Sequence, residues 1–98
     1  SGSALLGGMD YVVRQKQASP STPMVANMSI AGAASAAFDQ AVQSMIDAGV
    51  TSVVAAGNNA SDACNTSPAR LTAAITVGAS DERDAMASFS NWGGCVDI

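Results

Sequence analysis

Apolar residues recur at helical spacing near the start of the chain. The stripe consists of Leu5, Leu6, Met9, Val12 and Val13. It predicts a helix that begins after Ser3, whose hydroxyl is placed to cap the first-turn amides. The charged residues Asp10, Arg14 and Lys16 fall outside the stripe, and the proline-containing run at 19–23 ends the helix because proline lacks an amide proton.

A second amphipathic pattern follows Ser35, which is again placed as a helix N-cap. Asp39 near the amino end suits the helix dipole, and Gly49 stands just past the carboxyl end. The apolar positions of this predicted helix are Phe38, Ala41, Val42, Met45 and Ile46. Their spacing leaves one face for packing against a sheet.

Short apolar runs of strand length alternate with these helices. They are Met24–Ile30, Val50–Gly57, Ala73–Ala79 and the beginning of a fourth strand at Cys95–Ile98. We expect residues 24–30 to form a buried parallel strand, 31–34 a flexible turn, 58–70 a loop and 80–85 an acidic turn. Strand, helix and strand in succession favour a right-handed crossover. The predicted fold class is therefore α/β, a parallel sheet with flanking helices.

Size and charge narrow the classes of partner. A chain of 98 residues makes one domain at most and buries only about two-thirds of its unfolded surface. With 12% charged residues and a net charge of −4, it would repel nucleic acid. No apolar run approaches the roughly 20 residues that cross a bilayer, so we expect a soluble chain with no membrane partner. The amino terminus does not resemble a signal peptide, so we expect mature or excised material.

Cys64 and Cys95 are the two cysteines, and neither belongs to a zinc-type or C-x-x-C spacing. Two buried free thiols are one interpretation. A disulfide is favoured because both lie in loop-like sequence rich in glycine and asparagine. It would imply an oxidising, extracellular setting.

Asn58 is the main candidate for chemistry, because it follows a predicted strand at the edge where open α/β sheets bind ligands. A pre-aimed amide there can stabilise an oxyanion in acyl transfer. The alternative is a loop asparagine that caps its own turn. The chain has no histidine, so it cannot form a Ser-His-Asp relay by itself.

Gly57 and the run Ser29–Gly32 suggest two walls of small residues that face each other across a narrow slot. Such a slot suits an extended peptide, although small residues also serve tight helix–sheet packing. Among the carboxylates, Asp81, Glu82 and Asp84 predict a solvated turn. Asp97 differs because a carboxylate that enters a strand needs a partner or an ion.

Five runs together resemble the middle of a subtilisin-like serine protease, nearest to the proteinase K and aqualysin-like branch. They are Val-Ala-Asn-Met-Ser-Ile at 25–30, Ala-Ala-Gly-Asn-Asn at 55–59, Asn-Thr-Ser-Pro-Ala-Arg at 65–70, Thr-Val-Gly-Ala-Ser at 76–80 and Ser-Phe-Ser-Asn-Trp-Gly at 88–93. They cover nearly the whole chain in the family's order and spacing. The resemblance implies half of a doubly wound subtilisin-like domain.

The resemblance also implies roles for individual residues. Asn58 matches the side-chain oxyanion donor of the family. One wall of the specificity pocket matches Ser29, Ile30, Ala31 and Gly32, and the opposite wall matches Ala55, Ala56 and Gly57. A peptide or protein substrate would bind by strand addition between them. Ala31 stands where the family usually has glycine, which adds a methyl group to the slot.

Cys64 and Cys95 match a disulfide of the aqualysin-like branch. Asp97, with the backbone carbonyls of Thr72 and Ala74, matches a structural calcium site, since oxygen ligands suit a hard cation. The resemblance implies no catalytic cofactor.

The family's segments with the catalytic Asp, His and Ser would fall before residue 1 and after residue 98. None of Ser29, Ser35 and Ser90 has the nucleophile's Gly-Thr-Ser-Met-Ala context. We therefore expect a fragment of a secreted endopeptidase that is inactive alone, with an open sheet edge that favours self-association or a complementing chain. The alternative is a non-catalytic peptide-binding, structural or antigenic module.

Overall fold

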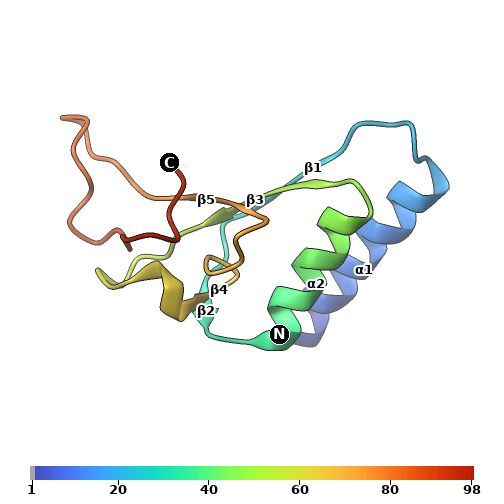
Figure 1. The fold of residues 1–98 in the computed structure, drawn as a ribbon, viewed down its shortest axis with the longest axis horizontal. Coiled ribbons are helices and arrows are strands. Elements are labelled where there is room, and N and C mark those ends of the chain that lie inside the picture. Colours follow the sequence, from blue (N-terminus) through green and yellow to red (C-terminus); the bar gives the residue numbers. More distant parts are fainter. Residues whose placement is uncertain (1) are drawn as a thin grey trace.

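The computed structural model describes residues 2–98. Two α-helices pack on one parallel sheet, and a short antiparallel ribbon and long loops lie beyond one end of it (Figure 1). The elements in order are α1 (Gly2–Ala18), β1 (Val25–Met28), β2 (Gly32–Ala33), α2 (Ala36–Asp47), β3 (Thr51–Ala55), the 3-10 turn η1 (Ala63–Asn65), β4 (Thr66–Ser67) and β5 (Ile75–Val77). The α/β class predicted from the sequence is confirmed.

The main sheet has the strand order β1-β3-β5, and both pairings are parallel. Val25 pairs with Thr51, and Val53 with Ile75. Because the strands are parallel, their carboxyl ends meet at one edge of the sheet. This edge is where the loops that follow β1, β3 and β5 come together.

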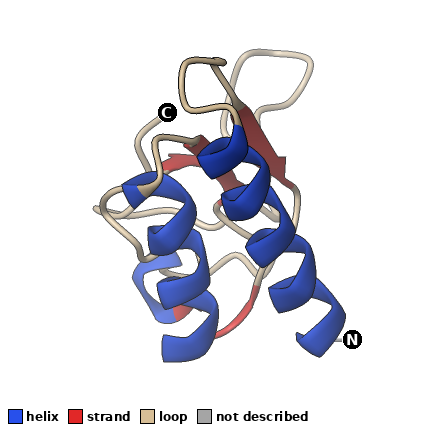
Figure 2. Ribbon diagram, turned by 90° about the vertical axis from the view of Figure 1, so that its right-hand side faces the viewer, coloured by secondary structure: helices blue, strands red, loops and turns tan. Residues whose placement is uncertain are grey.

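Helices α1 and α2 lie side by side on the same face of the sheet (Figure 2). The predicted apolar stripes supply Met9, Val42 and Met45 to the core, and the sheet side supplies Val50, Val54 and Ala74. Leu5 and Leu6 of the α1 stripe are exposed. The hydroxyl of Ser35 accepts a hydrogen bond from the amide of Phe38 at 3.2 Å, and Gly49 has a φ of +101°. Both predicted ends of α2 are thus confirmed. Within residues 2–98 no helix combines the length and hydropathy needed to cross a bilayer.

Two details of α1 differ from expectation. The helix begins at Gly2, so Ser3 lies inside it and not before it. Lys16 is only 8% exposed although it lies outside the apolar stripe. Its ammonium group donates to the carbonyls of Pro20 at 2.9 Å and Thr22 at 2.6 Å. These bonds satisfy the buried charge and fasten the chain reversal that follows the helix.

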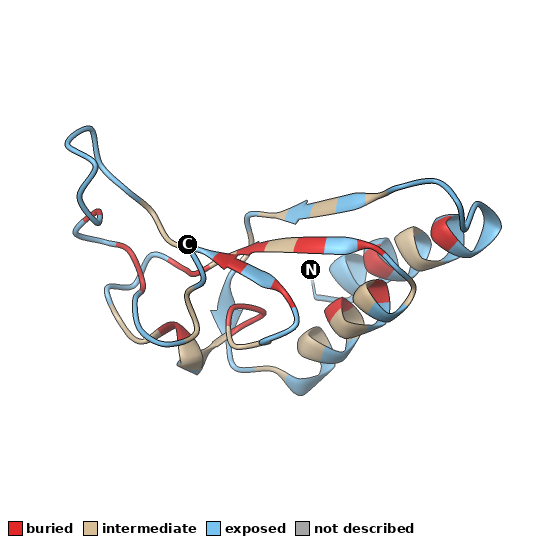
Figure 3. Ribbon diagram, turned by 45° about the horizontal axis from the view of Figure 1, so that its top comes forward, coloured by how far each residue is buried: buried red, intermediate tan, exposed pale blue. Residues whose placement is uncertain are grey.

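Residues 24–30 contain the predicted parallel strand, but the prediction that this strand is buried is wrong. β1 is an edge strand, and Val25 is 71% exposed (Figure 3). The reason is topological, because β1 pairs only with β3 and both helices cover the same face of the sheet. A short apolar run has the same sequence pattern in a central strand as in an edge strand, so the pattern does not predict burial.

The flexible turn expected at residues 31–34 contains a strand. Gly32 pairs with Ser67 and Ala33 with Thr66 in the antiparallel β2–β4 ribbon. The buried hydroxyl of Ser67 also accepts from the amide of Ser35 at 2.9 Å. The start of α2 is therefore tied to the loop before β5.

No strand begins at Cys95–Ile98, so this prediction is also wrong. The segment does run beside β5, where the amide of Asp97 donates to the carbonyl of Thr76 at 2.8 Å. A regular ladder fails because the Asp97 carboxylate itself accepts from the amide of Thr76 at 2.7 Å. Asp97 thus lies in an irregular segment, not in a strand.

Candidate functional site

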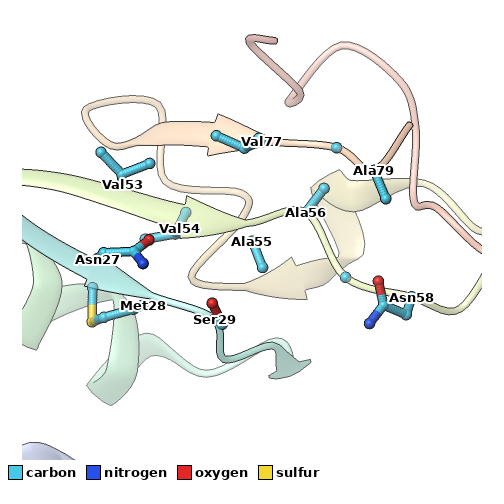
Figure 4. Close-up of a pocket in the computed structure, with 12 residues that line it drawn as sticks. Asn27, Met28, Ser29, Val53, Val54, Ala55, Ala56, Asn58, Val77 and Ala79 are labelled. Carbon is cyan, nitrogen blue, oxygen red and sulfur yellow. The ribbon is translucent and has the colours of Figure 1, made fainter. Parts of the chain in front are cut away.

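A cavity of about 380 Å³ lies at the carboxyl edge of the sheet (Figure 4). Ser29 lines it just after β1, Ala55–Asn58 line it at the end of β3, and Gly78 and Ala79 line it after β5. Val53 and Val54 of β3 also line it, although Val54 belongs to the helix-covered core as well. Because consecutive residues of β3 line it, the cavity lies at the end of the sheet and is not confined to one of its faces.

Asn58 is exposed and follows Gly57, which is buried and has a φ of +105°. This left-handed conformation turns the chain sharply where β3 ends. Figure 4 shows the Asn58 amide beyond the end of β3 and Ser29 beyond the end of β1, and both residues line the cavity. An exposed amide here can donate to a group bound in the cavity.

The predicted walls come together only in part. Ser29, Ala55, Ala56 and Gly57 line the cavity with Asn58. A methyl group built on Gly57 would lie 3.5 Å from the Ala31 Cβ, so Ala31 lies near Gly57, but it does not line the cavity.

Two other wall residues lie elsewhere. Ile30 lines a different groove of about 330 Å³ between β1 and the two helices, and it does not contribute to this cavity. Gly32 is paired with Ser67 in the ribbon and also stands apart from the cavity lining. The predicted wall at 29–32 therefore lines the cavity only at its beginning.

Sequence reasoning missed Asn91. Its side chain is 1% exposed and lies against the Gly57 turn, and its amide nitrogen donates to the carbonyl of Ala56 at 2.9 Å. Asn91 lies in the run at 88–93 that carries the family resemblance, but nothing in that run indicates burial. Only its contacts with residues some 30 positions earlier show its importance, as in the 3.1 Å bond from the amide of Ser61.

Cys64 and Cys95 form the predicted disulfide, with their Cα atoms 5.3 Å apart. The turn at η1 is capped by Asp62, whose carboxylate accepts from the amide of Cys64 at 2.9 Å. The disulfide therefore joins the loop after Asn58 to the last residues of the chain.

The remaining carboxylates are dispersed. Residues 2–98 contain no group of three or more His, Cys, Asp or Glu side chains that could hold a metal ion. Asp81, Glu82 and Asp84 are exposed, as predicted, and Asp81 accepts from the amides of Arg83 and Ala85 in its own turn. The bond between Asp97 and the Thr76 amide places that carboxylate beside β5, just downstream of Thr72 and Ala74. The calcium site stays a prediction.

Comparisons with known proteins bear on the family and the fold of the chain. The Peptidase S8 model of the subtilase family matches residues 2–98. The chain is 50% identical over 98 residues to alkaline serine exoprotease A of Vibrio alginolyticus and 53% identical over 98 residues to an extracellular serine proteinase of Thermus sp. strain Rt41A. A cold-adapted subtilisin-like serine proteinase of known structure superposes with a TM-score of 0.89 at 48% identity.

These matches cover all of this chain for the two sequence relatives and 98% of it for the structure. They cover 18%, 23% and 34% of the relatives themselves. The chain belongs to the subtilase family of serine proteases, and the resemblance to its proteinase K-like members is confirmed. It spans about a fifth of the length of the sequence relatives.

Proposed function

We propose that this chain is the central part of a secreted subtilase catalytic domain, in which Asn58 donates a hydrogen bond to the oxyanion formed during peptide-bond hydrolysis. The observation that carries the proposal is the shared cavity of Asn58 and Ser29 at the ends of neighbouring parallel strands. The Cys64–Cys95 disulfide supports secretion, because such bonds persist in oxidising compartments.

In this mechanism the Asn58 amide strengthens its hydrogen bond as negative charge develops on the carbonyl oxygen of the substrate. A donor that is aimed in advance needs no reorganisation at that moment. Loss of such a donor lowers kcat by roughly 10²–10³; this factor was established on the equivalent asparagine of a subtilase and is carried over to Asn58, not calculated from its geometry.

The substrate would lie as an extended peptide between Ser29–Gly32 and Ala55–Gly57. Backbone hydrogen bonds of the strand-addition type would provide affinity, and the slot between the walls would select side chains. Ala31 lies close to Gly57.

The chain alone would not hydrolyse peptides. It contains no histidine to activate a hydroxyl. The hydroxyl of Ser35 caps α2, and that of Ser90 donates to the carbonyl of Asn91 at 2.8 Å. In this proposal the catalytic Asp, His and Ser come from polypeptide outside residues 1–98.

A chimera tests the role of Asn58. Residues 2–98 would replace the matching segment of the cold-adapted proteinase, and the chimera would be assayed on a chromogenic peptide. Asn58→Ala should lower kcat by about 10²–10³ with little change in KM. Asn65→Ala is the matched control, because Asn65 is exposed on the same loop and does not line the cavity. Equal activity of the two variants would overturn the proposal.

A serine-directed acylating probe tests the inactivity of the isolated chain. We expect no labelling of the 98-residue chain and stoichiometric labelling of the chimera. Titration with a peptide aldehyde addresses the alternative of a non-catalytic peptide-binding module. Tight binding by the isolated chain, together with an inactive chimera, would favour that module.

We propose calcium as a structural ligand near Asp97. The donors would be its exposed carboxylate and the carbonyls of Thr72 and Ala74, and a set of oxygens without nitrogen or sulfur suits calcium. The position of the carboxylate beside the start of β5 supports this assignment. Bound calcium would fasten the last residues of the chain to the sheet.

The proposed further partner is a second polypeptide segment that covers the open side of the sheet. β1 has a neighbour on one edge only, and Val25 and Ile75 are 71% and 42% exposed on the strands. Unpaired strand edges and exposed apolar residues favour association. Sedimentation of the isolated chain should show self-association with rising concentration, and a monomer throughout would contradict this.

A further inference from the structure

Asn91 is the buried residue on which the loop with Asn58 rests. We propose that Asn91 is a positioning residue that sets the direction of the Asn58 side chain. This inference rests on the proposed oxyanion role of Asn58. Asn91 touches neither the substrate nor the reacting atoms in this scheme, and it acts only through the backbone of residues 56–61.

The acceptor side of the Asn91 side chain holds the backbone after Asn58. Its Oδ1 accepts from the amide of Asn59 at 2.9 Å and from the amide of Ser61 at 3.1 Å. The hydroxyl of Ser61 approaches the same oxygen at 3.4 Å. The Oδ1 atom of Asn91 therefore holds the two backbone amides that follow Asn58, those of Asn59 and Ser61.

The donor side of Asn91 holds the backbone before Asn58. Its Nδ2 donates to the carbonyl of Ala56 at 2.9 Å, and its backbone amide donates to the carbonyl of Gly57 at 2.8 Å. Asn58 is thus the residue between two anchored stretches. Its own side chain has no hydrogen-bond partner within residues 2–98, so its amide is free to meet a ligand.

These contacts specify asparagine at position 91. A primary amide offers a donor and an acceptor at one end, whereas aspartate lacks the donor and serine is shorter. The side chain is 1% exposed, so any group left unpaired there would be costly. Gly57 leaves room for the amide, because a β-carbon at position 57 would collide with Asn91 Nδ2.

Asn91 is itself held firmly. The carbonyls of its neighbours Phe89 and Trp92 accept from the amides of Ala60 at 3.0 Å and Ala63 at 2.9 Å. The hydroxyl of Ser90 accepts from the amide of Ala79 just after β5, at 3.0 Å. Residues 89–92 therefore connect the loop with Asn58 to the sheet through hydrogen bonds.

The first experiment needs no enzymatic activity. Amide hydrogen exchange of the 98-residue chain would be followed by NMR in the original sequence, Asn91→Ala and Asn91→Asp. In Asn91→Ala the amides of Asn59 and Ser61 should exchange at least about fivefold faster, because each loses its hydrogen-bond acceptor. The amide of Val54 in the core should keep its rate.

The Asn91→Asp variant distinguishes the acceptor role of the side chain from its donor role. It also provides a second test if Asn91→Ala fails to fold. Its carboxylate can still accept from the amides of Asn59 and Ser61, but it cannot donate to the carbonyl of Ala56. Protection of the two amides should therefore persist in Asn91→Asp. Unchanged exchange at these amides in the alanine variant, or protection lost equally in both variants, would contradict the proposed contacts.

The second experiment is a double-mutant cycle in the chimeric protease. Asn91→Ala should lower kcat by about 10- to 100-fold and change KM by less than about twofold, as expected for a displaced catalytic group. Added to Asn58→Ala it should have almost no further effect, since Asn91 acts through Asn58. Asn65→Ala serves again as the control.

The cycle distinguishes the two proposals. If Asn58→Ala leaves kcat unchanged, the oxyanion role fails whatever Asn91 does. If Asn58→Ala lowers kcat and Asn91→Ala does not, the positioning role alone fails. A fully additive double variant would mean that Asn91 supports activity by a route other than Asn58, and would also reject the inference.

Discussion

The amide of Asn91 occupies the space in which a β-carbon of residue 57 would lie. A methyl group on Gly57 would collide with Asn91 Nδ2 and would lie 3.2 Å from Asn91 Cγ. Gly57 also has a φ of +105°, which other residues adopt only with strain. The turn before Asn58 therefore requires glycine at position 57, because the buried side-chain amide of Asn91 fills the space that a side chain would need.

Gly57→Ala should consequently destabilise the chain by about 2–4 kcal/mol, from backbone strain together with overpacking against Asn91. Gly94→Ala is the matched control, because its methyl group would meet no atom within 4 Å. Its effect should stay within about 0.5 kcal/mol. Urea unfolding followed by circular dichroism measures both, and similar midpoints for the two variants would refute the requirement for glycine at position 57.

The Cys64–Cys95 disulfide closes a long loop, with 31 residues of sequence separation. Replacing both cysteines by serine should lower the free energy of unfolding by about 3–4 kcal/mol in the chain-entropy model. A reducing agent should destabilise the original chain by a similar amount and leave the serine variant unchanged. Destabilisation of the serine variant by the reductant would show that the reagent acts elsewhere.

The two ion pairs found within residues 2–98 should differ in strength. Arg70 Nε donates to Asp39 Oδ2 at 2.6 Å, and the Asp39 side chain is only 15% exposed. Arg70→Ala should cost about 1–3 kcal/mol, because it leaves a largely buried carboxylate without its partner. The Asp39 Oδ1 atom is already buried without a hydrogen bond, so the carboxylate has no second donor to rely on.

The control for this pair is Arg14→Ala. Arg14 and Asp10 form an i,i+4 pair at 3.1 Å on α1 with side chains 64% and 63% exposed. Removing this pair should lower the free energy of unfolding by no more than about 0.5 kcal/mol, and this difference should disappear in high salt. Thermal unfolding at low and high salt compares the pairs; equal losses for both variants would mean that burial does not govern their strength.

Calcium should stabilise the chain if Asp97 binds it. A free concentration of a hundred times Kd raises the free energy of unfolding by about 2.7 kcal/mol. We expect the Tm to fall on chelation and to recover when calcium is restored. Asp97→Asn should remove the response, whereas Asp84→Asn in the exposed turn should retain it. A response that persists in Asp97→Asn would place the ion elsewhere.

The periodicity of the sequence was enough to locate both helices, the ends of α2 and three of the four predicted strands. These features depend on local causes, such as the stripe from Phe38 to Ile46, the Ser35 cap and the glycine after the helix. The fourth predicted strand and the buried character of β1 were wrong. Both depend on which neighbours a segment acquires, and an apolar run carries no information about its neighbours.

The sequence by itself determined that Asn58 follows a glycine at the end of an apolar strand, and its motifs determined the family. Only the tertiary structure decided which residues surround that asparagine. It placed Ile30 in another groove, paired Gly32 with Ser67, and brought Asn91 beneath the loop from more than 30 residues away. The physical reason is that hydrogen bonds to a buried amide are made across the fold, and the local pattern of polar and apolar residues does not record which distant backbone groups will satisfy it.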